Sequence, residues 1–201
     1  MKPRRYRDRF DTERILNFAN IITAARIVLI PFFAQCIIQG KYPAAFTFFV
    51  ICGLTDALDG FIARIFSVKS KFGMLLDPIA DKALMATSFI ILGIYHKIPP
   101  WLVVITISRD IIILTGSLII IIFIGIEGIY TVSSSRVNTV LQVITIGYIL
   151  LLLAVPSILS RVGLSKYGVF LKVGLIYATG FTTCVSGIQY FIRGFKTLTR
   201  L

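Results

Sequence analysis

The chain has 201 residues, of which 57% are hydrophobic, and it carries 21 lysines and arginines against nine aspartates and glutamates. A mean hydropathy of +0.90 excludes a water-soluble domain, which would have to expose too much apolar surface. The 12% of aromatic residues excludes a disordered chain. The net charge of +12 fits basic loops at an anionic membrane surface better than a nucleic-acid binder, so no nucleic-acid partner is expected.

The first 14 residues, MKPRRYRDRFDTER, form a basic and polar juxtamembrane segment. They hold no short apolar core followed by a small-residue cleavage site, so they are not expected to be a removable signal peptide. Phe10, Ile15 and Phe18 can line the apolar side of a helix whose arginines meet lipid headgroups. We therefore expect a short interfacial helix at the N-terminus.

Six apolar stretches follow, each near the roughly 20 residues that a helix needs to cross a bilayer. They lie at Ile15–Ile38, Pro43–Phe66, Leu76–Tyr95, Pro100–Ile126, Val137–Leu159 and Val169–Ile192. Because lipid offers the backbone no hydrogen-bond partners, each stretch should be helical. No repeat or second domain is visible. The sequence thus predicts an all-α integral membrane protein with six transmembrane helices, in one domain over residues 1–201.

The basic residues predict how these helices are oriented. If the N-terminus is cytoplasmic, thirteen lysines and arginines lie in the cytoplasmic segments and four lie on the other side. The four are Lys41, Lys97, Arg161 and Lys166. Positive residues concentrate in cytoplasmic loops, so both termini are expected in the cytoplasm, and the cell (inner or plasma) membrane is the expected location.

Acidic residues inside the apolar stretches need a reason to be there. Five of the nine acids lie in or at the ends of the predicted spans, at Asp56, Asp59, Asp77, Asp81 and Asp110. A charge at the centre of a membrane helix costs roughly 2.5–3.5 kcal/mol, so four aspartates together cost on the order of 10 kcal/mol. Such residues are expected to face an internal polar cavity and to serve a function.

The spacing of four of these aspartates indicates a shared site. Asp56 and Asp59 are three residues apart and Asp77 and Asp81 four apart, so each pair shares one helix face. The short link SVKSKFG predicts an antiparallel hairpin that brings the pairs together near the cytoplasmic boundary. Converging carboxylates repel unless cations neutralise them, and hard oxygen ligands suit Mg²⁺, Mn²⁺ or Ca²⁺. Four carboxylates suffice for two divalent ions, an arrangement suited to displacement at phosphorus.

Small and basic residues lie beside these carboxylates. Gly60, Ala63 and Gly73 leave room for a bulky polar ligand close to the backbone. Arg64 can bind a diphosphate through its planar guanidinium. The Asp77-Pro78 step allows two interpretations: a helix that starts there with Asp77 as its N-cap, or a kinked helix already under way.

Two other interpretations compete with a catalytic site. The aspartates can be helix caps and Arg64, Lys69 and Lys71 ordinary loop charges, which accounts for one aspartate more easily than for four at paired helical spacing. Alternatively, carboxylates can line the ion path of a small transporter. Such a path favours polar residues across several helices and the full bilayer depth. The clustering of the acids on one hairpin favours a one-sided active site.

The segment DALDGFIARIFSVKSKFGMLLDPIAD resembles the signature of the CDP-alcohol phosphotransferase family, D-x2-D-G-x2-A-R-x8-G-x3-D-x3-D. All eight fixed positions are filled, by Asp56, Asp59, Gly60, Ala63, Arg64, Gly73, Asp77 and Asp81. We refer to residues 56–81 as the signature. The resemblance extends to the six-helix layout and to the stretch NIITAAR, with Asn20, Thr23 and Arg26, and so covers nearly the whole chain.

This resemblance implies a phosphatidyltransferase that displaces CMP from a CDP-linked donor, usually CDP-diacylglycerol, by an attacking alcohol. It implies that Asp56, Asp59 and Asp77 bind Mg²⁺ or Mn²⁺, as two divalent ions, and that Asp81 binds metal, acts as the catalytic base that deprotonates the hydroxyl, or does both. It implies that the donor's CDP group is bound by Gly60, Ala63, Arg64 and Gly73. It further implies a homodimer whose site opens to the cytoplasmic side.

The acceptor is the more open question. Arg109 and Arg136 are the candidates for a pocket that binds an acceptor phosphate. The alternatives are that Arg109 pairs with Asp110 or a neighbouring helix as a structural contact, and that Arg136 only marks the inside loop.

Two related enzyme types fit the remaining motifs. LLDPIADK and SGIQYFIRG resemble phosphatidylglycerophosphate synthases, which use glycerol 3-phosphate. The single arginine of the fourth stretch and the RVNT entry to the fifth are closer to cardiolipin synthases, which use phosphatidylglycerol. The former reaction is commoner among bacterial-looking chains of this length. Glycerol 3-phosphate is therefore the expected acceptor, with phosphatidylglycerol as the alternative.

Overall fold

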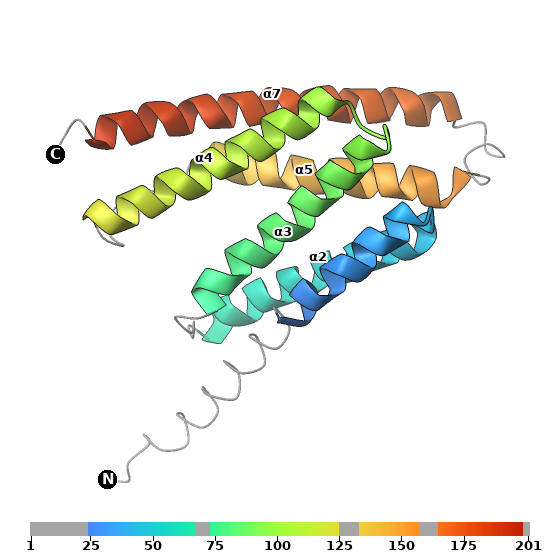
Figure 1. Ribbon diagram of the computed structural model, residues 1–201, viewed down its shortest axis with the longest axis horizontal. Coiled ribbons are helices and arrows are strands. Elements are labelled where there is room, and N and C mark those ends of the chain that lie inside the picture. The colour runs from blue at the N-terminus through green and yellow to red at the C-terminus, as the bar shows by residue number, and fades with distance from the viewer. Residues whose placement is uncertain (1–23, 67–72, 125–132, 157–164, 199–201) are drawn as a thin grey trace, which may run out of the picture. The chain divides into compact units, whose positions relative to one another are not determined.

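The computed structural model describes the backbone of residues 24–66, 73–124, 133–156 and 165–198 (Figure 1). Side-chain surroundings are described for residues 24–55, 82–116, 135–156, 167–190 and 192. The predicted interfacial helix of residues 1–14 lies outside the described part of the chain. Within that part the secondary structure is helical, with no strand.

Six long helices make up the described chain. The first covers residues 24–38. It is followed by α2 (Tyr42–Phe66), α3 (Gly73–Ile94), α4 (Pro100–Ile124), α5 (Ser133–Ala154) and α7 (Ser165–Leu198). Each helix overlaps one of the six predicted apolar stretches, the first of which is described only from residue 24, and α2 and α4 begin within one residue of the expected position. The largest difference is at α7, which extends beyond Val169–Ile192 at both ends because helical structure continues into flanking polar sequence.

Two tight turns separate helices where the sequence has its polar breaks. At the first, Gly40 has φ of 71°, and the amides of Gly40 and Lys41 donate to the carbonyls of Ile37 and Cys36. This is a Schellman cap, which glycine accommodates without strain at its left-handed position. At the second, His96 takes the left-handed position with φ of 54° and Lys97 donates to Leu92. The two prolines after this turn fit the start of α4.

The start of α3 decides between the two interpretations of the Asp77-Pro78 step. The helix begins at Gly73, four residues before Asp77. Asp77 is therefore not the N-cap, and Pro78 lies inside a helix that is already under way. Pro78 is the sixth residue of α3 and lacks the N–H that would otherwise bond to the carbonyl of Met74, so the helix continues there with one backbone hydrogen bond fewer.

The chain divides into two compact units, residues 1–87 and 88–201. In the first unit, the helix over residues 24–38 packs against α2. The rings of Phe33 and Phe49 lie 6.2 Å apart in a tilted arrangement, and both residues are buried together with Ile37, Ala45 and Cys52. Small and bulky apolar side chains thus alternate in this contact.

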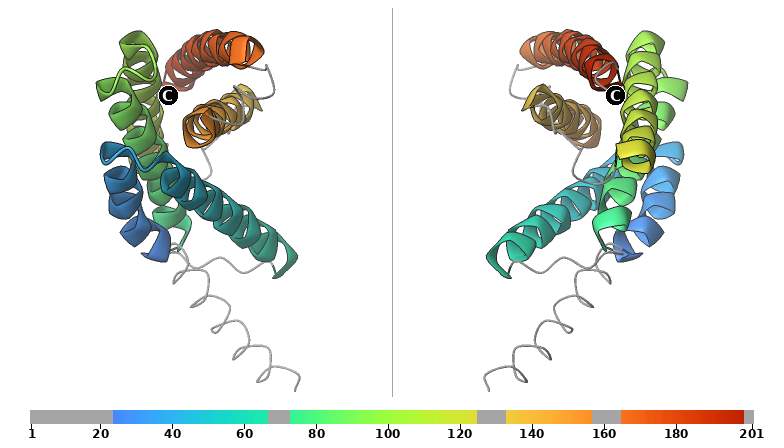
Figure 2. Two further views of the ribbon diagram at one scale, coloured as in Figure 1. Left: turned by 90° about the vertical axis from the view of Figure 1, so that its right-hand side faces the viewer. Right: turned by 90° about the vertical axis from the view of Figure 1, so that its left-hand side faces the viewer.

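In the second unit, α7 packs against both α5 and α4 (Figure 2). The chain runs in opposite directions in α5 and α7, which lie side by side in both views. Gly180 lets α7 approach α4 closely, because a Cβ at this position would lie 2.5 Å from Cζ3 of Trp101. Trp101 also stacks on Tyr177, with ring centroids 5.7 Å apart.

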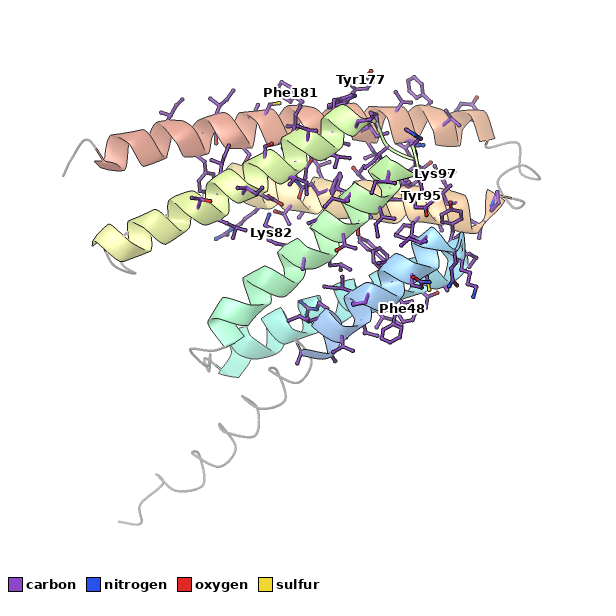
Figure 3. The ribbon with its side chains drawn as sticks, in the orientation of Figure 1. Phe48, Lys82, Tyr95, Lys97, Tyr177 and Phe181 are labelled. Atoms are coloured by element: carbon purple, nitrogen blue, oxygen red, sulfur yellow. The ribbon has the colours of Figure 1, made fainter. Side chains whose placement is uncertain are left out.

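The second unit buries several polar side chains among apolar ones and exposes many large apolar side chains. Arg109, Asn138 and Gln142 are at most 3% exposed. In contrast, Tyr177 and Phe181 are 64% and 71% exposed and project from the outer side of α7 (Figure 3). Among the described residues, two segments are long and apolar enough to cross a membrane, Ser135–Ala154 and Tyr167–Tyr190. Exposed apolar side chains, together with polar groups that are buried between helices, are the arrangement expected in lipid.

Candidate functional site

The backbone places the four signature aspartates on two helices joined by a short link. Asp56 and Asp59 lie in the second half of α2, and Asp77 and Asp81 lie in the first half of α3. Only residues 67–72 separate the two helices. At about 1.5 Å per residue, Asp59 lies about 10 Å before the end of α2 and Asp81 about 12 Å after the start of α3. The two pairs therefore occupy similar distances from the link.

The helical backbone also fixes which signature residues share a face. The spacing of three in α2 and four in α3 leaves each aspartate about one turn from its partner. The side chains of residues 56–81 are outside the described part, so their contacts are not part of the structure described here. The predicted ligands of the CDP group lie on the same elements, with Gly60, Ala63 and Arg64 in α2 and Gly73 as the first residue of α3.

The chemistry of this donor set fits divalent cations. Four carboxylates supply hard oxygen atoms, and their charge in apolar helices requires compensation. Among residues whose side chains are described, no group of three or more His, Cys, Asp and Glu residues can hold a metal ion. The signature aspartates are not among those residues and are the candidate ligands.

Arg109 is the centre of a second polar cluster, in the other unit. Its Nη1 donates to Oδ1 of Asp110 at 2.6 Å, and its Nη2 donates to Ser135 Oγ at 2.6 Å and Ser186 Oγ at 2.9 Å. The guanidinium thereby connects α4 to α5 and α7. Gly187 of α7 lies beside it, and a Cβ there would make an ordinary van der Waals contact of 3.8 Å with the Cγ of Arg109.

These contacts bear on the predicted role of Arg109. Its structural alternative, a pairing with Asp110 and neighbouring helices, is present in the structure. The buried Nε has no hydrogen-bond partner among the described groups, so the guanidinium keeps an N–H available for a ligand. Arg136, the other predicted acceptor residue, follows Ser135 directly and is exposed. A role for either arginine in acceptor binding stays a prediction.

A row of polar contacts continues from Arg109 along the interface of α5 and α7. Oδ1 of Asn138 accepts from Oγ1 of Thr182 at 2.9 Å and of Thr183 at 2.8 Å. Two turns farther along α5, the hydroxyls of Thr145 and Thr179 lie 2.7 Å apart. We call the α5 residues Ser135, Asn138, Gln142 and Thr145 the polar stripe. Their spacing of three or four residues places them on one helix face.

Three buried residues near this row have polar atoms without a partner in the described structure. They are Thr106 through Oγ1, Asn138 through Nδ2, and Gln142 through both amide atoms. If the oxygen and nitrogen of the Asn138 amide are exchanged, one of the two atoms still has no partner. One end of the amide contacts the two threonine hydroxyls, and the other end contacts none of the described groups. Unpaired buried polar atoms are uncommon in native proteins and mark places where a ligand or water belongs.

The sequence alone did not identify most of this row as a site. Asn138 and Gln142 stand out as amides in an apolar helix, and their spacing of four could have indicated a polar face. Their partners in α7, Thr179, Thr182, Thr183 and Ser186, have a similar periodicity. Pairing the two sets requires the register between α5 and α7, which the sequence does not provide.

Comparison with known proteins adds an independent observation. The model of the CDP-alcohol phosphatidyltransferase family matches residues 16–185. A probable cardiolipin synthase (CMP-forming) of Drosophila melanogaster is 33% identical over 94% of this chain and 61% of its own length. The CDP-diacylglycerol–glycerol-3-phosphate 3-phosphatidyltransferase of Bacillus subtilis is 30% identical, covering 92% of this chain and 98% of the relative. A probable phosphatidylglycerophosphate synthase of Mycobacterium tuberculosis is 27% identical, covering 92% and 85%. The chain thus spans about three fifths of the fly protein and most of the bacterial ones.

Proposed function

Because the chain belongs to the CDP-alcohol phosphatidyltransferase family, we propose that it transfers the phosphatidyl group of CDP-diacylglycerol to an alcohol and releases CMP. The observation that carries this proposal is the complete signature, whose carboxylates lie on two helices joined by residues 67–72. The hydroxyl oxygen of the acceptor forms a new bond to the diacylglycerol-linked phosphorus. The bond from that phosphorus to the oxygen of CMP breaks, and CMP leaves with the electron pair.

The signature residues divide this work by their chemistry. Asp56, Asp59, Asp77 and Asp81 would hold divalent cations, Mg²⁺ or Mn²⁺ and two in number, which supply charge neutralisation of the diphosphate when bound. The carboxylate of Asp81 also accepts the proton of the attacking hydroxyl. The guanidinium of Arg64 binds the diphosphate.

Glycines and alanine provide space for the donor. Gly60, Ala63 and Gly73 carry little or no side chain, so the CDP group can lie close to the backbone of α2 and the start of α3. A larger side chain at any of these positions would occupy the place of the ligand.

Glycerol 3-phosphate is the proposed acceptor, and the product is then phosphatidylglycerophosphate. The similarity to the Bacillus subtilis phosphatidyltransferase, which extends over 98% of that protein, supports this choice. Phosphatidylglycerol is the alternative acceptor, supported by the 33% identity to the probable cardiolipin synthase of the fly. Arg109 and Arg136 are the proposed residues for the acceptor's phosphate.

The membrane arrangement belongs to the same proposal. Five of the helices have 22 to 34 residues, enough for the roughly 30 Å of a bilayer core at about 1.5 Å per residue. We propose one domain with six transmembrane helices in the cell membrane, with both termini and the site on the cytoplasmic side. The excess of basic residues in the predicted cytoplasmic segments supports this orientation. We also propose a homodimer, on the basis of the family resemblance.

The test is a CMP-release assay with the purified, detergent-solubilised chain. Incubation with CDP-diacylglycerol, Mg²⁺ or Mn²⁺ and radiolabelled glycerol 3-phosphate is expected to release CMP and label a lipid. A parallel incubation replaces glycerol 3-phosphate with phosphatidylglycerol and decides between the two acceptors. EDTA is expected to abolish turnover. No CMP release with either acceptor, nor with inositol phosphate or serine, would refute the proposed activity.

A further inference from the structure

Lys172 is a charged residue on the packed face of α7. It precedes Ile176 by four residues and Thr179 by seven, and both of these side chains are buried. Spacings of four and seven residues keep side chains on one face of a helix. Lys172 is itself half-buried, whereas its apolar neighbours Leu171 and Val173 are exposed. A lysine thus lies on the inner side of the helix, where an apolar residue is expected, and its charge there needs a reason.

The helices α4 and α7 run in the same direction and keep a nearly constant register. The ring of Trp101 stacks on that of Tyr177, 76 positions later in the chain. About two turns farther along α4, Arg109 donates to Ser186, 77 positions later. A residue close to the start of α4 therefore lies opposite the residue about 76 positions after it.

This register brings Lys97 beside Lys172. Lys97 lies in the turn that precedes α4 (Figure 3), and an offset of 76 positions places it opposite residue 173. The positive charges of the two lysines accordingly act on each other. Two ammonium groups repel, and they repel more strongly where they are partly removed from water. An anion bound beside both lysines would offset this repulsion.

The described acidic residues of this unit do not provide that anion. Asp110 is the only acidic residue in residues 88–201 whose side chain is described, and it pairs with Arg109. It is the eleventh residue of α4, about 15 Å of helix from the start, whereas Lys97 precedes the helix. An anion from outside this part of the chain can take the place beside the lysines.

Aromatic residues around the lysines indicate where this end of the unit lies. Tyr95 precedes Lys97 by two residues, and Lys172 lies between Tyr167 and Tyr177 along α7. All three tyrosines are exposed, as is Trp101. Tryptophan and tyrosine concentrate at the membrane–water interface, at the level of the lipid headgroups. The anionic group available at that level is the phosphate of a phospholipid.

We propose that Lys97 and Lys172 together bind the headgroup of a phospholipid with a net negative charge. The inference goes beyond the proposed activity and requires only that these helices lie in a membrane. In the proposed orientation the turn between α3 and α4 is on the non-cytoplasmic side, so the bound lipid is neither the donor nor the acceptor of the reaction. Charge complementarity selects this lipid over phosphatidylcholine, whose choline group cancels the charge of its phosphate.

The experiment uses Trp101, the single tryptophan of the chain, as a reporter beside the lysines. The full chain is reconstituted in phosphatidylcholine vesicles that contain a small fraction of phosphatidylserine or phosphatidylcholine with brominated acyl chains. Bromine quenches tryptophan fluorescence on close approach. The brominated phosphatidylserine is expected to reach half of the maximal quenching at a mole fraction at least about fivefold lower, since each lysine near a membrane surface favours anionic lipid by roughly that factor.

Lys97→Gln and Lys172→Gln are each expected to reduce this difference, and the double variant to bring it within about twofold. Lys41→Gln is the matched control. It removes an exposed lysine from the turn before α2, which is also expected on the non-cytoplasmic side, and should leave the difference unchanged. If the lysines only stabilise the fold, their variants lower the melting temperature and keep the wild-type difference in quenching. That result, or an equal loss in Lys41→Gln, overturns the inference.

Two measurements on the wild type cover the case in which the variants do not fold. Equal quenching by the two brominated lipids overturns the inference without any variant. Millimolar inorganic phosphate, compared with sodium chloride at equal ionic strength, should leave the preference in place. If phosphate alone removes it, the lysines bind a free anion and the assignment to a lipid is wrong. No substrate is present in these assays, so their outcome is independent of whether the chain releases CMP.

Discussion

Arg109 and Asp110 are adjacent in α4 and form an ion pair, with 2.6 Å between Nη1 and Oδ1. Neighbouring residues on a helix point about 100° apart, so the long arginine side chain must bend back to reach the carboxylate. Their side chains are 3% and 10% exposed, which makes the pair an internal one. Because each charge neutralises the other, the two residues can lie between the apolar segments of α4. The remaining contacts of the guanidinium, to Ser135 and Ser186, then tie α4 to two other helices.

Asp110→Asn is expected to destabilise the protein. The substitution removes the negative charge and leaves the buried guanidinium of Arg109 uncompensated, a change that costs roughly 3–5 kcal/mol in buried pairs. A lower melting temperature in detergent would confirm it. Ser108→Ala on the same helix is the control. Because Ser108 is exposed, the loss of its hydroxyl should leave the melting temperature unchanged. Equal melting temperatures for Asp110→Asn and the wild type would show that the pair adds nothing to stability.

Arg109→Lys separates charge from geometry at the same position. Lysine keeps the positive charge but lacks the planar guanidinium that reaches Asp110, Ser135 and Ser186 together. If Arg109 orients the acceptor's phosphate, KM for the acceptor should rise by about tenfold, corresponding to about 1.4 kcal/mol, with KM for CDP-diacylglycerol unchanged. Steady-state kinetics with each substrate varied in turn measure this. A variant that is less stable but has wild-type KM values would leave Arg109 a purely structural residue.

The helix ends could be predicted where the sequence marks them with turn residues. Gly40 and the prolines at 99 and 100 place the starts of α2 and α4 correctly. The ends of α7 were predicted less well, because an apolar stretch marks the part of a helix that suits lipid, whereas backbone hydrogen bonding continues into polar sequence as far as Leu198.

The candidate site was predictable to different degrees in the two units. The signature could be recognised because eight fixed residues at fixed offsets lie within residues 56–81. The contact of Asn138 with Thr182 and Thr183 joins residues more than 40 positions apart. Such a contact depends on how α5 and α7 are aligned along their lengths. Nearly uniform apolar helices contain little information about that alignment.

Gly180→Ala is expected to destabilise the contact of α7 with α4. The added Cβ would lie 2.5 Å from Cζ3 and 2.8 Å from Cη2 of Trp101, so the ring or the helix must move. The ring stacks on Tyr177, which restricts its movement. Overpacking of this kind costs about 1–3 kcal/mol.

Gly174→Ala is the matched control for this change, on the same helix. No atom lies within 4 Å of the Cβ that it would add. Alanine in a helix is more favourable than glycine by roughly 0.5–1 kcal/mol, so this variant should be as stable as the wild type or slightly more stable. Thermal unfolding of both variants in one detergent makes the comparison. A melting temperature for Gly180→Ala at or above that of Gly174→Ala would contradict the close approach of the helices.

Asp81→Asn tests the assignment of the catalytic base and of the metal ligands together. The amide cannot accept the proton of the attacking hydroxyl and is a weaker, uncharged ligand, so CMP release is expected to fall by at least about 100-fold, within the usual contribution of a general base. Asp56→Asn removes a proposed ligand that is not the base. Its activity should fall as well, but higher Mn²⁺ or Mg²⁺ concentrations should restore part of it by mass action. Asp8→Asn, an acidic residue outside the signature, is the control and should retain full activity. Metal titrations of CMP release distinguish the three variants, and an Asp81→Asn variant with wild-type activity would remove the basis for both roles.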